Sequence, residues 1–263
     1  MKAQNSNTLS LLNSMKMELH GHKKKTTFFS NALKNFINSN GVSPNNLSIL
    51  EIGCSNGSLV TLPLAEQGYN ILGIDLHEPS INQANNNNKF ENAAFQLKNL
   101  VDFESSEIFD VIILSDILEH VDDPKHLLDL SYKHLSNGGL ILVSVPNGFG
   151  PSELERKFLE KTKIIKLINL TISFISKIIG RKSSAYNSDS GHIQFFKMKE
   201  LKNLYKSTNL KIETFQKGAL FGGALSYPLG KLLPFIVKPS LFIADKIHFN
   251  LVSTWYFSLK KNK

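Results

Sequence analysis

Cysteine is almost absent from the sequence, which has one, Cys54, among its 263 residues. A single cysteine cannot form a disulfide bond within the chain, so a disulfide-stapled secreted domain and a cysteine-rich zinc site are both excluded. No run of about 18 uncharged apolar residues is present, and the first 25 residues lack the continuous apolar segment of a secretion signal. These absences predict a cytoplasmic protein that does not span a membrane.

Acidic residues are scarce outside the middle of the chain. Between Val42 and Gly150 there are fourteen Asp and Glu against four Lys, although the formal net charge of the whole chain is +8. The flanks are therefore strongly basic. A nucleic-acid-binding protein does not normally concentrate its acids in this way, so we expect no nucleic-acid partner. The basic flanks favour contact with an anionic surface or an anionic substrate.

The chain alternates between strand-like and helix-like segments. We expect strands at 47–53, 69–75, 93–99, 109–116 and 139–146, with helices at 58–68, 79–88 and 124–135 between them. Strand segments such as "DVIILS" and "LILVSV" are apolar at consecutive positions, which indicates burial on both faces of a parallel sheet. A later helix at 198–209 and strands at 210–216 and 250–260 complete the pattern. The sequence thus predicts a Rossmann-like α/β fold with a doubly wound, seven-stranded mixed sheet.

We expect four parts in the chain. They are a polar lead-in (1–27), a core (28–147), a helical cap insertion (148–190), and a C-terminal completion of the core (191–263) with an apolar insertion at 218–247. A break of about 45 residues in the strand-helix rhythm after Pro146 marks the cap. Long irregular segments inside compact sheet proteins are usually functional.

The turn after the first strand, in "ILEIGCSNGS", carries the main functional signal. A phosphate-binding P-loop needs Gly-Lys-Ser or Gly-Lys-Thr, which is absent, and a dinucleotide fingerprint needs closer glycines than Gly53 and Gly57. A third kind of turn has an acid two residues before the first glycine, as Glu51 is, and an acid at the end of the next strand, as Asp75 is. In this geometry the backbone amides point at a ligand beyond the sheet edge.

"LEIGCSNG" followed by "ILGID" resembles the class I S-adenosylmethionine-dependent methyltransferases. The resemblance covers 47–147, and 191–216 resembles the late helix and strand of the subgroup that includes small-molecule O-methyltransferases. It implies that S-adenosyl-L-methionine is bound, with Asp75 on the ribose hydroxyls. Ser55 departs from the family, which usually has glycine there, and Asn99 stands where many relatives have Asp. The implied cofactor contacts are Glu51, Gly53, Cys54, Ser55, Gly57, Asp75, Leu76, Asn99, Leu100 and Ser115.

Methyl transfer to a hydroxyl group requires a group that accepts the hydroxyl proton. Glu119 and His120 follow the fourth strand, and His192 opens the segment that returns over the same edge, so these three are the candidate catalytic residues. The structural alternatives are that His120 only begins a helix and that His192 only fixes the cap.

A divalent metal held by Glu119, His120, Asp122 and Asp123 is the other chemistry that this stretch suggests. Adjacent residues rarely converge on one ion, and acids before a proline suit a helix N-terminus. We therefore expect no metal. Cys54 has no predicted base beside it and is interpreted as a small buried thiol rather than a nucleophile.

Two apolar segments lie in the basic flanks. Residues 161–182 place large apolar side chains on one half of a helical wheel and lysines on the other, with no acid. Such a helix lies at an anionic membrane surface or packs as a lid over the domain. Residues 218–245 are also apolar. An acceptor with an apolar tail, or a homodimer interface, would explain both segments.

These observations predict methyl transfer from S-adenosyl-L-methionine to a small-molecule acceptor, at a hydroxyl of an envelope glycan, a lipid-linked intermediate or a quinone-like ring. The protein would be cytoplasmic, with peripheral contact at the inner face of the membrane. One alternative is a catalytically silent scaffold that binds the cofactor and uses its cap for a partner. An NAD-dependent oxidoreductase is disfavoured by the glycine spacing.

Overall fold

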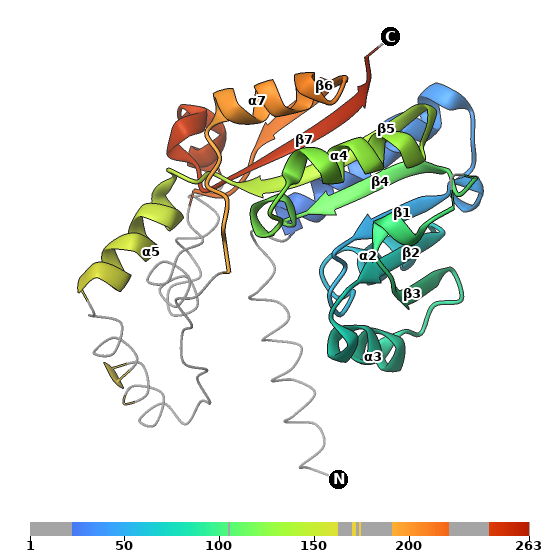
Figure 1. Ribbon diagram of the computed structural model, residues 1–263, viewed down its shortest axis with the longest axis horizontal. Helices are drawn as coiled ribbons and strands as arrows, with labels where there is room; N and C mark the ends of the chain where they lie inside the picture. Colours follow the sequence, from blue (N-terminus) through green and yellow to red (C-terminus); the bar gives the residue numbers. More distant parts are fainter. Residues whose placement is uncertain are drawn as a thin grey trace.

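The computed structural model describes residues 23–104, 106–162, 170–171, 174, 191–220 and 242–262. Its centre is a seven-stranded sheet in the order β3-β2-β1-β4-β5-β7-β6 (Figure 1). The strands are β1 (Ile49–Ile52), β2 (Ile71–Asp75), β3 (Ala93–Leu97), β4 (Phe109–Ser115), β5 (Leu135–Pro146), β6 (Leu210–Lys217) and β7 (Thr254–Lys261).

Helices alternate with the strands along the chain. The first spans residues 23–40, and another short helix covers 242–246. The others are α2 (Thr61–Ala65), α3 (Glu78–Asn87), α4 (Pro124–His134), α5 (Pro151–Thr162) and α7 (Met198–Ser207), with the 3-10 turns η1 (Pro44–Asn46), η2 (Leu100–Asp102), η3 (Leu118–His120) and η4 (Phe249–Leu251).

The sheet is mixed. β1 to β5 are parallel to one another, whereas β7 is antiparallel to both β5 and β6. All four residues of β1 and five of the seven in β4 are buried, as the unbroken apolar runs predict for strands covered on both faces. The predicted seven-stranded, doubly wound α/β fold is confirmed.

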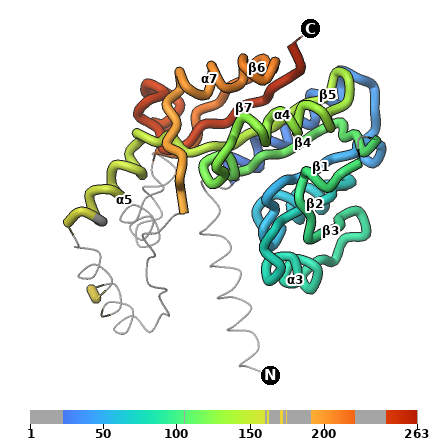
Figure 2. Tube along the Cα trace, viewed as in Figure 1, coloured from blue at the N-terminus to red at the C-terminus, as the bar shows by residue number. Residues whose placement is uncertain are grey.

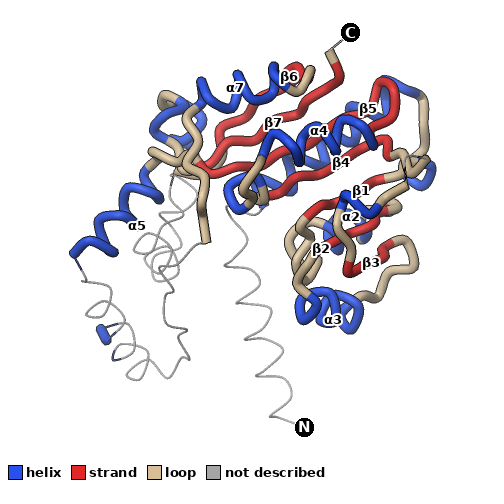
Figure 3. The backbone as a smooth tube through the Cα atoms, in the orientation of Figure 1, coloured by secondary structure: helices blue, strands red, loops and turns tan. Residues whose placement is uncertain are grey.

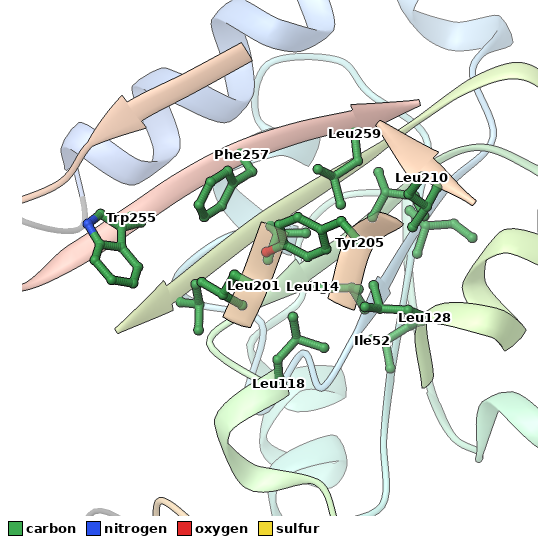
Figure 4. Packing of buried hydrophobic residues seen from close by; sticks show 14 of the residues in the cluster. Ile52, Leu114, Leu118, Leu128, Leu201, Tyr205, Leu210, Trp255, Phe257 and Leu259 are labelled. Carbon is green, nitrogen blue, oxygen red and sulfur yellow. The ribbon is translucent and has the colours of Figure 1, made fainter. Parts of the chain in front are cut away.

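Helices cover both faces of the sheet (Figure 3). Two apolar clusters form the core, one on each face. On one face α4 and α7 contribute Leu128, Leu201 and Tyr205 to a cluster with Phe257 of β7 (Figure 4). On the other face the helix 23–40, α2 and α3 pack against the sheet, and the helix 23–40 is the first blue segment in Figure 2. Neighbouring residues of β7 serve opposite clusters because side chains alternate along a strand.

Two elements differ from the sequence expectation. The first described helix begins at residue 23, so residues 23–27, expected in the polar lead-in, are helical. α2 has only five residues, where a helix over 58–68 was expected. Residues 58–60 and 66–68 form turns instead, and Gly68 has a φ of +89°, which an α-helix does not have.

The helix α4 begins as the sequence predicts. Asp123 accepts a hydrogen bond from the backbone N–H of His126 at 2.9 Å, and Pro124 occupies the first turn. The acid before the proline is therefore a helix cap.

The cap insertion is described only in part. α5 begins it and projects away from one end of the sheet (Figure 1). Most of the basic amphipathic segment 161–182 and of the apolar insertion 218–247 lies outside the described residues. Among the helices that the structure describes, none is both long and apolar enough to cross a membrane.

Candidate functional site

The strand register brings three sequence-predicted positions to one edge of the sheet. Ile52 of β1 is paired with Ile74 of β2 and with Leu114 of β4. The next residue on each strand is Gly53, Asp75 or Ser115. Because the three strands are parallel, their carboxyl ends meet at one edge, where open α/β sheets bind ligands.

The turn after β1 needs glycine at both predicted positions. Gly53 and Gly57 have φ angles of +74° and +72°. A Cβ on Gly57 would lie 2.4 Å from the ring of Phe95, and one on Gly53 would lie 2.8 Å from Cδ1 of Ile117. A larger residue would push the turn away from the sheet edge. The two glycines therefore let the turn pack tightly against Phe95 and Ile117.

Ser55, at the centre of the turn, also has a left-handed backbone, with φ of +51°. Its backbone N–H donates to Oδ2 of Asp75 at 2.8 Å. A side chain in this conformation costs about 1–2 kcal/mol, a strain typical of functional turns. The bond to Asp75 ties the turn to the end of β2.

Asp75 is oriented by backbone contacts on both carboxylate oxygens. Oδ2 accepts from Ser55, and Oδ1 accepts from the backbone N–H of His77 at 2.8 Å. A carboxylate oxygen has two acceptor sites, so each oxygen keeps one for a ligand. This arrangement suits the two neighbouring hydroxyl groups of a ribose.

Glu51 lies beneath the turn rather than in it. Its carboxyl group is 3% exposed, and Oε2 accepts from the hydroxyl of Thr61, the first residue of α2. Burial raises the pKa of Glu51 to about 7, although the Thr61 bond and the nearby Lys25 oppose the shift. Glu51 therefore connects the base of the turn to the start of α2.

Cys54 is also buried below the turn. A Cβ on Gly73 of β2 would lie 2.9 Å from its sulfur. Burial raises the pKa of the Cys54 thiol, with Glu51 and Asp75 adding to the effect. A protonated, buried thiol agrees with the interpretation of Cys54 as a packing residue.

The predicted ring-binding residues divide into exposed and buried side chains. Leu76 is 70% exposed, whereas Leu100 is 2% exposed and belongs to the core. Val101 is 52% exposed. Leu76 and Val101 are therefore exposed apolar side chains near this edge, as is Leu97 at the end of β3, whereas Leu100 is not exposed.

Asn99 begins the turn η2. Its side-chain oxygen accepts from the backbone N–H of Val101 at 3.3 Å, while Asp102 accepts from the backbone N–H of Asn99. The Asn99 side chain thus has a capping role beside any contact with a ligand.

A buried lysine from the first helix reaches the end of β4. Nζ of Lys25 lies 2.8 Å from Oγ of Ser115 and 2.7 Å from Oδ2 of Asp116, and its side chain is 4% exposed. Asp116 also accepts from the hydroxyl of Ser144 and has a φ of +53°. Neither Lys25 nor Asp116 was a predicted site residue. Asp116 follows the strand directly and could have been chosen, but nothing distinguishes Lys25 within its lysine run.

Glu119 is almost completely buried beside this network. It is 1% exposed, and its Oε2 has no hydrogen-bond partner among the described residues. Burial raises the pKa of Glu119 to about 9, and the charge of Asp116 adds to the shift. The carboxyl group is therefore protonated at neutral pH.

The segment 191–197 returns over η3 and brings the two predicted histidines together. The Glu119 carbonyl accepts from the backbone N–H groups of Ile193 and Gln194 at 2.9 and 3.0 Å. The rings of His120 and His192 lie 4.9 Å apart, and Nδ1 of His120 is 3.0 Å from the carbonyl oxygen of Gly191. All three predicted catalytic residues thus meet at one place.

His192 is held by a buried carboxylate from α5. Its Nδ1 lies 2.8 Å from Oε1 of Glu153, and Arg156 donates to the other oxygen of Glu153 at 2.8 Å. Burial alone would raise the pKa of Glu153, but the bonds from His192 and Arg156 lower it. An ionised Glu153 accepts a proton-bearing Nδ1, which leaves Nε2 of His192 as the basic nitrogen. Glu153 had no sequence signal because the contact spans 39 residues.

The same cluster has the spacing of a cation site. Ligand atoms of Glu119, His120 and His192 lie within 4.8 Å of one another. This set shares two residues with the stretch considered from the sequence, but it replaces Asp122 and Asp123 with His192. Glu119 would have to lose its proton before it could ligate an ion.

A family model described as "Methyltransferase domain" matches residues 22–214. Among curated proteins, the chain is 31% identical over 103 residues to a ubiquinone biosynthesis O-methyltransferase of Rickettsia akari, covering 38% of this chain and 41% of that protein. A protein of the same name from Rickettsia typhi is 25% identical over 181 residues, covering 66% and 64%. The chain thus spans about two fifths to two thirds of the length of these relatives.

Solved structures share the fold. The plantazolicin methyltransferase BpumL, in complex with SAH, has a TM-score of 0.57 at 18% identity and covers 98% of this chain and 91% of its own. An S-adenosylmethionine dependent methyltransferase from Mesorhizobium loti has a TM-score of 0.54 at 16% identity, covering 88% and 96%. The family model covers most of the chain, and the sheet order and glycine turn agree with it. The protein therefore belongs to the methyltransferase domain family.

Proposed function

We propose that the protein transfers the methyl group of S-adenosylmethionine to a hydroxyl group on a quinone-like ring. The observation that carries this proposal is the pair of imidazole rings at the carboxyl edge of the sheet, with His192 oriented by Glu153. The names of the Rickettsia relatives support a quinone-like acceptor over an envelope glycan or a lipid-linked intermediate.

The cofactor would lie along the edge between the turn and Asp75. Gly53 and Gly57 allow the turn to pack on Phe95 and Ile117, and the backbone of this turn would hold the amino-acid part of the cofactor. Asp75 would accept from the two ribose hydroxyls, and charge-assisted hydrogen bonds are about twice as strong as neutral ones. Leu76 and Val101 would cover the adenine.

When bound, S-adenosylmethionine supplies a methyl group on a sulfonium; the acceptor oxygen bonds to this carbon while the carbon–sulfur bond breaks and its electron pair stays on sulfur. The protein must hold the two reactants in line. Nε2 of His192 takes the hydroxyl proton, and ionised Glu153 stabilises the imidazolium that results. The ring of His120 lies against the ring of His192. The proposed reaction uses no metal, so a chelator should leave its rate unchanged.

The test measures SAH formation with S-adenosylmethionine and an alkyl-substituted catechol. Wild-type protein should form SAH, and His192→Gln should lower kcat by about 100-fold or more, because a general base contributes about 10²–10⁴-fold. His126→Gln, on the exposed surface of α4, is the matched control and should keep the wild-type rate.

A turnover rate that is the same in His192→Gln and wild type would contradict the assignment of the base. A rate that falls with chelator in both proteins would instead favour a metal at Glu119, His120 and His192. Cofactor binding without SAH formation for any phenol or catechol would favour the silent scaffold.

Two further proposals concern membrane contact and oligomeric state. The basic flanks support peripheral contact with an anionic membrane from the cytoplasmic side, through 161–182. The protein should sediment with anionic vesicles and should stay in the supernatant with neutral vesicles. The apolar insertion would also suit a homodimer, which light scattering tests.

A further inference from the structure

A pocket lies near the carboxyl end of β5, away from Asp75 at the end of β2. It has a volume of about 680 Å³ and is lined mainly by the start of α7, the end of β5 and the η4 region. The sheet order places β1 and β4 between β2, which ends in Asp75, and β5. The pocket is therefore separate from the turn that holds the cofactor, and its volume falls in the range of small-molecule sites.

The walls of this pocket are apolar and aromatic. Phe149, Met198, Phe249 and Trp255 all line it. Phe149 follows the end of β5, after Asn147 and Gly148, and is 46% exposed. Figure 4 shows Trp255 near the start of β7, and this side chain is 1% exposed. Phe149 and the partly exposed Phe249 offer a surface for an alkyl chain or a ring, whereas Met198 and Trp255 are buried behind it.

The walls are held in place by hydrogen bonds. Nδ2 of Asn147 donates to the carbonyl oxygens of Asn250 and Val252, each at 2.9 Å. The indole N–H of Trp255 donates to the carbonyl oxygen of Phe249 at 2.8 Å. The pocket is thus preformed, and a ligand would not have to pay for ordering these groups.

The charged groups lining the pocket are all lysines: Lys197, Lys199 and Lys202. Lys197 lies 4.8 Å from the ring centre of Phe149 and 3.9 Å from Glu200, which caps α7. Lys199 and Lys202 make no ion pair within the part of the chain that the structure describes. Cations are unfavourable in the first turns of a helix, so helix stability does not explain them.

We infer that this pocket binds a single-chain anionic amphiphile, with its acidic headgroup among Lys199, Lys202 and Lys197 and its alkyl chain along Phe149 and Phe249. A bare anion would leave the aromatic wall unused, and a neutral or cationic lipid would leave the lysines unpaired. The inference does not depend on the proposed methyl transfer, because no cofactor or reacting group takes part.

Trp255 supplies the measurement, because it is the single tryptophan of the chain. Dodecyl phosphate is titrated below its micelle concentration while Trp255 emission is recorded, with inorganic phosphate, dodecyltrimethylammonium and dodecyl maltoside as separate arms. The inference predicts a saturable change with dodecyl phosphate alone. A change of similar affinity with inorganic phosphate, or with the cationic or neutral amphiphile, would overturn it.

Variants assign the signal to the pocket. Lys199→Gln combined with Lys202→Gln should weaken dodecyl phosphate binding at least tenfold, and Phe149→Ser should weaken it severalfold. The control is Lys206→Gln combined with Lys211→Gln, which removes two exposed lysines outside the pocket and should keep affinity within twofold. All the substituted side chains are exposed, so folding should be preserved. Equal affinity in the pocket and control variants would overturn the inference.

Discussion

The turn at Gly53–Gly57 and the histidine cluster beyond β4 lie at the same edge of the sheet but are built in different ways. The turn is local: the bond from Ser55 to Asp75 spans 20 residues and uses a backbone N–H. The cluster joins distant segments through side chains, with 71 residues between His120 and Gly191 and 90 between Lys25 and Ser115. A turn defined by backbone geometry has a recognisable spacing of glycines and acids in the sequence. A cluster of side chains from distant segments has no such sequence pattern.

Removal of the buried lysine would test the distant assembly most strongly. Lys25→Met keeps the alkyl chain but leaves Asp116 without its cation, and should lower the free energy of unfolding by about 3 kcal/mol, the lower end for buried pairs because Asp116 is 39% exposed. Lys34→Met, on the exposed side of the same helix, should cost less than about 0.5 kcal/mol. Urea unfolding measures both values. Equal stability of the two variants would show that the Lys25 contact is not structural.

The base of the turn should impose a pH dependence on stability. The folded protein keeps a proton on Glu51, whose pKa is raised to about 7 from 4.5. Unfolding therefore releases a proton between these values, and stability falls as pH rises through this window. Relative to Glu51→Gln, the wild type should lose up to about 1.4 kcal/mol per pH unit between pH 5 and pH 7, and little beyond. Urea unfolding from pH 5 to pH 8 checks this, and parallel profiles would contradict it.

Substitutions of exposed and of buried apolar residues near the proposed adenine position should have different effects on cofactor binding and on stability. Leu76→Ser and Val101→Ser remove exposed side chains and should weaken S-adenosylmethionine binding about fivefold each, or about 1 kcal/mol. Leu100→Ala should instead lower the free energy of unfolding by about 2–4 kcal/mol. The control is Ile108→Ser, which is 43% exposed and lies before β4 at the other edge. Calorimetric titration and thermal unfolding separate the effects; weaker binding with unchanged stability in Leu100→Ala would reverse the assignment.

The smallest effect is expected at Ser55. Ser55→Gly relieves a left-handed backbone that costs about 1–2 kcal/mol, but glycine loses more entropy on folding, by roughly 0.5–1 kcal/mol. We expect a gain in stability of about 0.5 kcal/mol with cofactor affinity kept. A clear loss of stability in thermal unfolding would show that the serine side chain makes a contact that the turn needs.

Much of the fold could be predicted because burial on both faces leaves an unbroken apolar run, as in β4. The turn and Asp75 could be proposed as site residues because the family resemblance rests on the spacing of these glycines and acids, and the structure brings them to one edge. Lys25 and Glu153 could not, since their partners are fixed only when the sheet is assembled. Leu100 and Val101 are adjacent, and a resemblance does not tell which of the two side chains faces the core.

Calorimetric titration of S-adenosylmethionine into wild-type protein and Asp75→Ala tests the central claim most directly. Loss of the charge-assisted bonds to the ribose should raise Kd by about 100-fold, since hydrogen bonds to a charged group contribute roughly 1.5–3 kcal/mol. Glu78→Ala, on the nearby surface of α3, should bind as the wild type does. Equal Kd values for wild type and Asp75→Ala, or no binding by either protein, would contradict the account.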